Sequence, residues 1–452
     1  MIVALQAGRL VEVQITSLAA GGDGVGRTED GCVVFVPDSV PGDRLEVRLT
    51  RVKKDHAFGK LHRLIEPSTQ RTRARCIVAD RCGSCQWQWV DYAVQLDAKQ
   101  DLVRAALERL GGLREPPVLK TLRQEPAFGY RNKSTFPVGK NSRGEVIAGY
   151  YRKDSHRIVN INACPVQDRR LDPLLVAAKQ AISTQNWPVY DEATHTGTVR
   201  HLAMRIGERT GEMLLTLVIT TWDLPGITTV AEALQVQFPE LVGVCLNLNP
   251  EPGNTILGSQ TRCVAGRPYL NEVLDGFTFH IEPTTFFQIH TTQAEVLARL
   301  VVEAGQAGSA DTVIDCYCGI GALSLPLARG AGRVIGIESH VRSVEQARAN
   351  ALANELTNCA FLTGTVEEQL GTLTPDVVVL DPPRKGCGES VLHTIVDQAP
   401  RRVVYVSCNP ATLARDLKVL CAERYVLESV QPVDLFAQTY HVEAVAALRC
   451  IA

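Results

Sequence analysis

The sequence predicts an α/β protein whose C-terminal part is a Rossmann-like, doubly wound sheet, preceded by an OB-like β-barrel and a central mixed α+β part. Two patterns carry this prediction: short strands separated by Gly and Pro turns at the N-terminus, and apolar strands alternating with helices from Phe286 onward. With 452 residues, 45% of them hydrophobic, the chain is long enough for several cores. We place three domains at residues 1–66, 67–285 and 286–452.

The composition argues against a membrane protein. No run of about 18 consecutive apolar residues occurs. The stretch MIVALQAGRLVEVQI lacks the basic start and cleavable apolar run of a secretory signal. We therefore expect a cytoplasmic location and no membrane partner. The formal net charge of -2 excludes a protein that is basic over its whole surface.

The first 66 residues show the strand patterns of a small barrel, in LVEVQITSL, CVVFVPDSV, RLEVRLTRVKK and FGKLHRLIEPS. A small barrel of the OB-like type is a common platform for single-stranded nucleic acid. Between Arg44 and Arg75, ten Lys and Arg stand against three acidic residues, for a net charge of +7. Taken alone, this segment is either a polyanion-binding surface or simply a basic face.

The central part begins with a cysteine cluster. Cys76, Cys82 and Cys85 form a C-x5-C-x2-C pattern, and Cys164 stands alone in NACPVQD. Three thiols this close are typical of a zinc or iron-sulfur site, with Cys164 as the fourth ligand, and three unrelated cysteines are the alternative. A disulfide framework is disfavoured by the expected cytoplasmic location. Zinc sites usually pair their ligands in two short hooks, so three ligands together favour the cluster. An amphipathic helix, YAVQLDAKQDLVRAALERLGG, and a strand-rich segment follow.

The last part contains the pattern of a nucleotide-cofactor site. VIDCYCGIGALSLPLA places a strand, a turn at Gly319 and Gly321, and then a helix, and RVIGIE ends in Glu338. Such a turn lets a ligand approach a helix N-terminus, and an acid at the next strand tip can bind ribose hydroxyls. The G-x-G-x-x-G fingerprint is missing, which favours S-adenosylmethionine over NAD. In VVVLDPPRKG, two prolines end the strand and fix Asp381 as an acceptor.

A cysteine ends the next strand. In VVYVSCNPATLARD, strand-forming residues lead to Ser407 and Cys408, and an Asn-Pro pair follows at once. Because Asn-Pro stops a strand, Cys408 is expected at the carboxyl edge of the sheet. Open α/β sheets place their chemistry at that edge.

Together these pieces closely resemble one family: the S-adenosylmethionine-dependent RNA (uracil-5-)-methyltransferases that carry a TRAM domain and an iron-sulfur cluster, of the type that acts on 23S ribosomal RNA. The matching motifs span nearly the whole chain: PGD and VKK in the barrel, the four cysteines, GYRNK, FFQ, DCYCGIG, DPPRKG, SCNPAT and HVEA. SCNP together with DPPR is specific to the family. The resemblance implies that the barrel is a TRAM domain and that the doubly wound sheet is a methyltransferase sheet.

The resemblance also implies a role for each candidate residue. Cys408 is the nucleophile, Glu443 is the general base, Gln288, Tyr317, Glu338 and Asp381 surround S-adenosylmethionine, and Cys76, Cys82, Cys85 and Cys164 ligate a 4Fe-4S cluster. The chain departs from the family in CGSCQWQW, where a second glycine and then a histidine are usual, but the ligand spacing is kept.

The implied chemistry agrees with these residue types. Carbon 5 of uracil is a poor nucleophile, so a thiolate first adds to carbon 6 and creates an enolate that attacks the sulfonium methyl. A carboxylate then removes the carbon 5 proton, and the thiol leaves. We expect a depressed pKa for Cys408 at the start of the next helix. The target base must leave its stack, and Phe286, Phe287 and Tyr440 are candidates to stack on it, although packing in the core is at least as expected for Phe286.

RNA is the expected partner, and its phosphates would lie on the basic segment, with Arg131, Asn132 and Lys133 as weaker candidates for the same task. Ribosomal RNA is the commoner target among members with the cluster, and transfer RNA is the alternative. A monomer is the default expectation.

Two functions of other classes compete. A non-catalytic iron-sulfur protein that binds RNA would not need both Cys408 and Glu443. An amino-methyltransferase would not need a nucleophilic cysteine, and there DPP is normally followed by an aromatic residue, where this chain has Arg384. A cytosine-5-methyltransferase is chemically close but usually takes its nucleophile from a Pro-Cys element.

Overall fold

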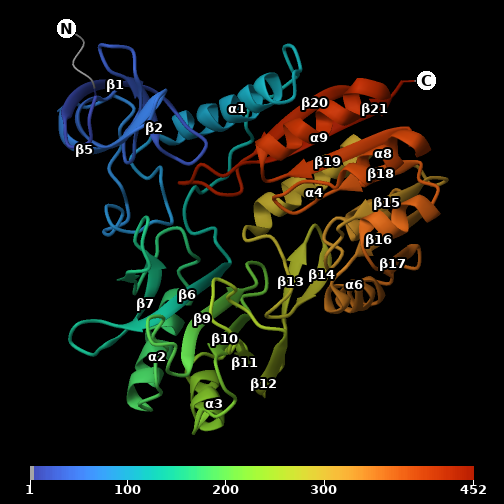
Figure 1. Ribbon diagram of the computed structural model, residues 1–452. Coiled ribbons are helices and arrows are strands. Elements are labelled where there is room, and N and C mark those ends of the chain that lie inside the picture. Colours follow the sequence, from blue (N-terminus) through green and yellow to red (C-terminus); the bar gives the residue numbers. More distant parts are fainter. Residues whose placement is uncertain (1–4, 452) are drawn as a thin grey trace.

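The computed structural model describes residues 5–451. Residues 1–4 and 452, which the expected first and last domains include, lie outside the described residues. Figure 1 shows the barrel and the C-terminal sheet in the upper half of the view, with the central sheet below them. The domain bounds 1–66, 67–285 and 286–452 stay a prediction.

The N-terminal strands close into a barrel in the order β1-β2-β3-β5-β4, as the turn pattern predicts. Their bounds are β1 (Leu10–Leu18), β2 (Gly24–Arg27), β3 (Val33–Val36), β4 (Arg44–Val52) and β5 (His56–Glu66). Every second side chain points inward, because side chains alternate along a strand. The small core that results includes Val34, Val36, Leu45, Val47 and Ala57.

The central part is a seven-stranded sheet with the order β12-β11-β10-β9-β6-β7-β8. The strands are β6 (Lys133–Lys140), β7 (Val146–Tyr151), β8 (Ile158–Asn160), β9 (Val199–Ile206), β10 (Met213–Ile219), β11 (Leu241–Leu248) and β12 (Gln260–Gly266). Helix α2 (Leu171–Thr184) packs against β7 and β9, and α3 (Ile227–Gln237) packs against β11 and β12. A hairpin of β13 (Leu270–Leu274) and β14 (Phe277–Ile281) leads from this sheet towards the C-terminal part.

The C-terminal part is the predicted doubly wound sheet, with the order β17-β16-β15-β18-β19-β21-β20. The strands are β15 (Thr312–Cys316), β16 (Arg333–Glu338), β17 (Cys359–Thr363), β18 (Val377–Leu380), β19 (Arg402–Ser407), β20 (Tyr425–Val433) and β21 (Glu443–Cys450). The first five positions are parallel, whereas β21 enters antiparallel between β19 and β20.

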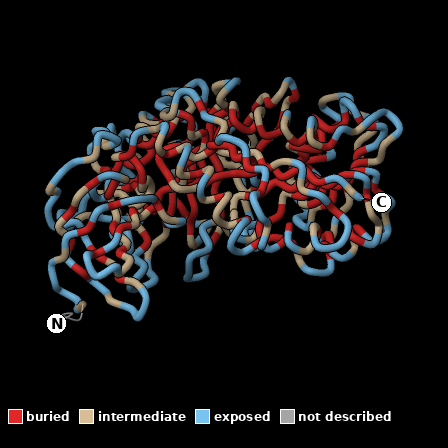
Figure 2. The backbone as a smooth tube through the Cα atoms, turned by 90° about the horizontal axis from the view of Figure 1, so that it is seen from above, coloured by how far each residue is buried: buried red, intermediate tan, exposed pale blue. Residues whose placement is uncertain are grey.

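Helices cover both faces of this sheet, and each face has its own buried cluster of apolar side chains. The helices are α4 (Thr291–Gly305), α5 (Ser324–Ala328), α6 (Val341–Ala353), α7 (Val366–Gln369) with the 3-10 turn η1 (Leu370–Thr372), α8 (Glu389–Gln398) and α9 (Pro410–Glu423). The predicted amphipathic helix is α1 (Tyr92–Arg109), and it packs against α9. Figure 2 shows buried residues running continuously through the interior while the surface loops are exposed.

Within residues 5–451, none of the helices has both the length and the apolar character that crossing a bilayer requires.

Candidate active site

The carboxyl ends of the parallel strands bring most of the candidate residues to one edge of the C-terminal sheet. Tyr317, Asp381 and Cys408 directly follow β15, β18 and β19, and Glu338 is the last residue of β16. This is the edge at which open α/β sheets bind ligands.

One pocket at this edge is lined by Gln288, Tyr317 and Asp381, three of the four residues expected around the cofactor. The Gly319–Gly321 turn forms one wall, with φ of 55° and 89° at the two glycines. A Cβ at Gly321 would lie 2.9 Å from a methyl carbon of Leu325, so the turn needs glycine there. Glu338 lies beside the turn, where its carboxylate accepts hydrogen bonds from the backbone N–H of Gly319 at 3.2 Å and of His340 at 2.7 Å.

The pocket contains a carboxylate that sequence reasoning missed. Asp315 is fully buried in β15, and its Oδ2 accepts a hydrogen bond from the Ser324 hydroxyl at 2.5 Å. Within the described residues, its other oxygen has no hydrogen-bond partner. Burial raises the pKa of Asp315 to about 7, and burial followed by the nearby Asp315 charge does the same for Asp381. The signal in the sequence was an acidic residue near the end of the predicted strand in VIDCYCG, just before the glycine turn.

Cys408 and Glu443 are neighbours across two strands. Strand β21 pairs antiparallel with β19, and Ser407 lies opposite Ala444, so the next residues, Cys408 and Glu443, lie side by side at the sheet edge. Glu443 is 5% exposed, and Cys408 is half-buried. The local turn is shaped by Ser407, whose hydroxyl oxygen accepts a hydrogen bond from the Asn409 backbone N–H at 3.1 Å.

The electrostatics of the two residues differ from the expectation. Burial and then the charge of Glu443 raise the pKa of Cys408 to about 11, while Arg384 acts in the opposite direction. The prediction of a depressed pKa was therefore wrong. The thiol precedes the Asn409 cap and lies among carboxylates, and these effects outweigh the start of helix α9. The pKa of Glu443 is raised well above its usual range, mainly by burial and then by Asp381.

Arg384 is the cation of this site, and sequence reasoning gave it no role. The Asn409 amide and the Thr412 hydroxyl both donate hydrogen bonds to its carbonyl oxygen, at 3.0 and 3.3 Å. Its guanidinium lies 3.0 Å from Nδ1 of His441. Burial lowers the pKa of His441 to about 4, so the ring is neutral at pH 7 and accepts from Arg384. The motifs DPPRKG, SCNPAT and HVEA thus meet at one point.

The three aromatic candidates have different positions. Both Phe286 and Phe287 line the pocket beside the Gly319–Gly321 turn. Phe286 is 66% exposed and so does not pack in the core, whereas Phe287 is 1% exposed and packs near Phe279, with ring centroids 5.7 Å apart. The prediction that Phe287 stacks on a base is wrong, because its ring belongs to the core. Tyr440 is half-buried, and its ring centroid lies 4.2 Å from that of His441.

The four candidate metal ligands are free thiols on two segments of the chain. Cys82, Cys85 and Cys164 border one apolar cluster, and burial raises the pKa of each, that of Cys85 to about 12. Cys76 interacts electrostatically with Cys82 and Cys164. In residues 5–451, no three His, Cys, Asp or Glu side chains are grouped so as to hold a metal ion. The cluster therefore stays a prediction.

None of the three weaker phosphate candidates is fully exposed: Asn132 is 2% exposed, and Arg131 and Lys133 are half-buried. The Arg131 cation lowers the pKa of Cys82, Cys85 and Cys164, which places it beside the thiols. Its Nε atom is buried and has no hydrogen-bond partner among the described residues. Burial lowers the pKa of Lys133 to about 7, a value unlike that of a solvated cation.

Comparison with known proteins gives a consistent result along the chain. Residues 4–62 match the TRAM domain model, and residues 258–450 match the tRNA (Uracil-5-)-methyltransferase model. An uncharacterized RNA methyltransferase of Gloeobacter violaceus is 62% identical, over 98% of this chain and 97% of the relative. An uncharacterized RNA methyltransferase of Bacillus cereus is 38% identical, over 97% of this chain and 96% of the relative. The crystal structure of the Pyrococcus abyssi tRNA (uracil-54, C5)-methyltransferase with S-adenosyl-L-homocysteine is 27% identical, with a TM-score of 0.76, over 97% of this chain and 100% of that one.

Proposed function

Because this chain belongs to the family of S-adenosylmethionine-dependent RNA (uracil-5-)-methyltransferases, we propose that it methylates carbon 5 of a specific uridine, with Cys408 as the nucleophile and Glu443 as the base. The observation that carries this proposal is the pairing of β19 with β21, which puts a thiol and a buried carboxyl side by side at the ligand-binding edge. An amino-methyltransferase would need neither group.

In the proposed reaction, Cys408 first loses its thiol proton to water. The thiolate sulfur then forms a bond to carbon 6 of the uracil, and the displaced electron pair moves onto the carbonyl oxygen at position 4. The electron pair at carbon 5 of the enolate takes the methyl group of S-adenosylmethionine, the bond from that methyl to the sulfonium sulfur breaks, and S-adenosyl-L-homocysteine is the leaving group. Glu443 then accepts the carbon 5 proton, the double bond between carbons 5 and 6 re-forms, and the Cys408 thiolate leaves.

The electrostatics assign the remaining tasks. A pKa of about 11 keeps Cys408 as a neutral thiol in the free enzyme, and the positive charge of Arg384 favours its thiolate form when the base is attacked. The raised pKa of Glu443 makes its ionised form a strong proton acceptor, and burial shields it from water.

We propose that the pocket beside the Gly319–Gly321 turn holds S-adenosylmethionine, with Gln288, Tyr317, Glu338 and Asp381 around it and Asp315 as an additional contact. Ionised Asp315 and Asp381 suit a cofactor that carries a positive sulfonium. The complex of the Pyrococcus abyssi enzyme with S-adenosyl-L-homocysteine supports such a site in this fold.

We also propose that Cys76, Cys82, Cys85 and Cys164 hold a 4Fe-4S cluster. The donor set fits such a group, because all four cysteines are free thiols and three of them, Cys82, Cys85 and Cys164, lie beside the Arg131 cation. The Nε atom of Arg131 is buried and lacks a partner within the described residues. Positive charge there would offset that of four thiolates. The test is the iron and sulfide content of anaerobically purified protein. Cys164→Ser should lose most of the iron and Cys421→Ser should keep it, whereas iron-free wild type would contradict this role.

For the RNA itself, we propose a uridine of 23S ribosomal RNA as the first substrate to test, on the strength of the four-cysteine set. Transfer RNA is the second candidate, because the Pyrococcus abyssi neighbour acts on it. Both RNAs, taken from cells that lack the modification, enter the same assay.

The experiment uses tritiated-methyl S-adenosylmethionine and nucleoside analysis of the RNA product. Wild type should form 5-methyluridine, and Cys408→Ala should form none. Glu443→Gln should retain RNA as a denaturant-stable adduct, because the proton that must leave before elimination is not removed. Methylation by Cys408→Ala, or label on a base nitrogen, would overturn the proposed mechanism.

A further inference from the structure

The outer face of the barrel carries a group of aromatic side chains that the proposed chemistry does not use. Strands β3 and β5 run parallel, with Val33 opposite His56 and Phe35 opposite Phe58. The residues between them, Val34 and Ala57, are fully buried in the barrel core. Since side chains alternate along a strand, Phe35, His56 and Phe58 all project from the outer face, where each is partly exposed.

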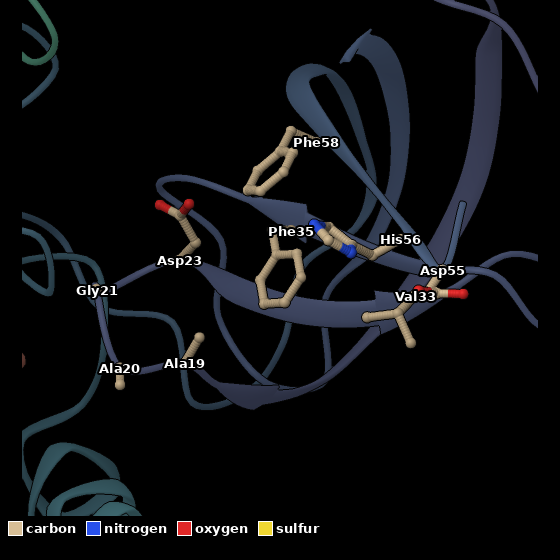
Figure 3. A pocket seen from close by; sticks show the side chains of 9 residues that line it. All are labelled: Ala19, Ala20, Gly21, Asp23, Val33, Phe35, Asp55, His56 and Phe58. Carbon is tan, nitrogen blue, oxygen red and sulfur yellow. The ribbon is translucent and has the colours of Figure 1, made fainter. Parts of the chain in front are cut away.

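These rings form a compact platform. The centroids of Phe35 and Phe58 are 5.4 Å apart with an interplanar angle of 25°, and His56 meets both rings edge-on, at 5.7 and 5.2 Å. With the loop Ala19–Asp23 they line a pocket of about 410 Å³. Figure 3 shows the three rings gathered on this face, with the loop beside them. Flat apolar surfaces of this kind are the platforms on which unpaired bases stack.

Positively charged side chains lie around the pocket, as on a surface that binds a phosphate backbone. Arg51 lies over the Phe58 ring, 4.3 Å from its centroid, and Lys53, Lys54 and Lys60 are exposed nearby on β5 and the turn before it. Two acids, Asp23 and Asp55, also line the pocket. Asp23 is paired with Lys153 at 2.8 Å, and Asp55 is exposed. Aromatic rings interleaved with such cations fit a nucleic acid strand better than an apolar peptide.

The pocket is connected to the candidate active site by a chain of contacts. The carbonyl of Gly22, in the pocket loop, accepts a hydrogen bond from the Trp87 indole at 3.0 Å. A Cβ placed on Gly22 would lie 3.1 Å from the Tyr440 ring. Tyr440 in turn packs on His441, the partner of Arg384 beside Cys408. The barrel pocket therefore borders the segment that carries Tyr440 and His441, which also reaches the candidate active site.

We infer that the pocket formed by Phe35, His56 and Phe58 binds one unpaired nucleobase of the substrate RNA by stacking, at a position other than the methylated uridine. This inference rests on the proposed function, since it describes how the same RNA is held. It assigns the barrel a base-stacking contact in addition to the charge of its basic segment.

The test measures binding of full-length protein to a labelled oligouridylate on the order of eight nucleotides long, a length that one OB-like barrel can cover. A strand of equal length without bases serves as the second probe. Wild type should bind the oligouridylate more tightly than the abasic strand. Phe35→Ala and Phe58→Ala should each weaken oligouridylate binding by about five- to 150-fold and leave abasic binding unchanged.

Two further variants serve as controls for the loss of the aromatic rings. Phe58→Tyr keeps the ring and should bind like wild type. Leu64→Ala removes an exposed apolar side chain from the same strand outside the pocket, and should change neither affinity. Equal binding of both probes by wild type, or unchanged oligouridylate binding by both Phe→Ala variants, would overturn the inference.

The methylation assay separates this inference from the proposed function. Wild type that shows base-dependent binding lost in Phe35→Ala, yet forms no 5-methyluridine, would contradict the function and support the pocket. In active enzyme, Phe35→Ala should raise KM for RNA and leave kcat and the affinity for S-adenosylmethionine unchanged, because the pocket lies outside the cofactor site.

Discussion

The chemical reactivity of Cys408 in the free enzyme follows from its surroundings. An unperturbed thiol has a pKa near 8.5, whereas burial and the Glu443 charge raise that of Cys408 to about 11. Below both values the thiolate fraction falls tenfold for each unit of pKa, so Cys408 should hold roughly two orders of magnitude less thiolate than a free cysteine. Its alkylation by iodoacetamide should accelerate about tenfold per pH unit between pH 7 and about pH 10.

Two substitutions should move this rate in opposite directions. Glu443→Gln removes a negative charge beside the sulfur, so it should lower the pKa of Cys408 and speed alkylation by about tenfold at pH values where Glu443 is ionised. Arg384→Gln removes the opposing cation and should slow alkylation by a smaller factor, because that side chain is exposed. Lys385→Gln, at the neighbouring exposed cation, is the matched control and should have no effect.

The assay follows the tryptic peptide VVYVSCNPATLAR by mass spectrometry after quenched labelling, which isolates Cys408 from the other 13 of the 14 cysteines. A reaction rate that is already maximal near pH 7 would contradict a raised pKa of Cys408, since it requires a low-pKa thiolate. Slower alkylation in Glu443→Gln would refute the assigned sign of the Glu443 charge.

Three further predictions concern stability and cofactor binding. Lys99→Met should lower the free energy of unfolding, measured in urea titrations, by about 3–5 kcal/mol. The reason is that Asp434, the fully buried partner of Lys99 at 2.6 Å, loses its countercharge. The double variant with Asp434→Asn should recover part of this loss. Without cofactor, the melting temperature of Asp381→Asn relative to that of wild type should increase as pH rises from 5 to 8. The reason is that the Asp381 carboxyl of wild type ionises near pH 4 when unfolded but only near 7 when folded. If the difference between the two melting temperatures does not change with pH, burial is not the cause of the raised pKa. Calorimetry should show S-adenosylmethionine binding wild type more tightly as pH rises through 7, where Asp315 and Asp381 ionise, and pH-independent affinity would count against these two carboxylates as contacts.

Much of the fold follows from local patterns. The strands of the barrel and the alternation of strands and helices after Phe286 were predictable, because each depends on the period of apolar residues and on nearby Gly and Pro. The position of β21 between β19 and β20 was not predictable in this way. It depends on pairing with β19 across a separation of about 40 residues, and that pairing places Glu443 beside Cys408.

The site residues also differ in whether a local motif or a contact between distant segments reveals them. Cys408 and Asp381 are marked by their own motifs at strand ends. Arg384 and His441 gain a role only where the segments DPPRKG and HVEA meet, and a single motif does not show that contact. The pKa of Cys408 was predicted with the wrong sign, because the helix start is local while the burial and the carboxylates come from distant segments.

The most direct test of the central claim uses RNA labelled with tritium at carbon 5 of uridine, together with unlabelled S-adenosylmethionine. If Cys408 activates carbon 5 and Glu443 removes its proton, wild type should release one tritium into water for each methyl group transferred. Cys408→Ala should release none, and Glu443→Gln should release far less while the adduct accumulates. Methyl transfer without tritium release would place the methyl group elsewhere on the RNA and would contradict the account.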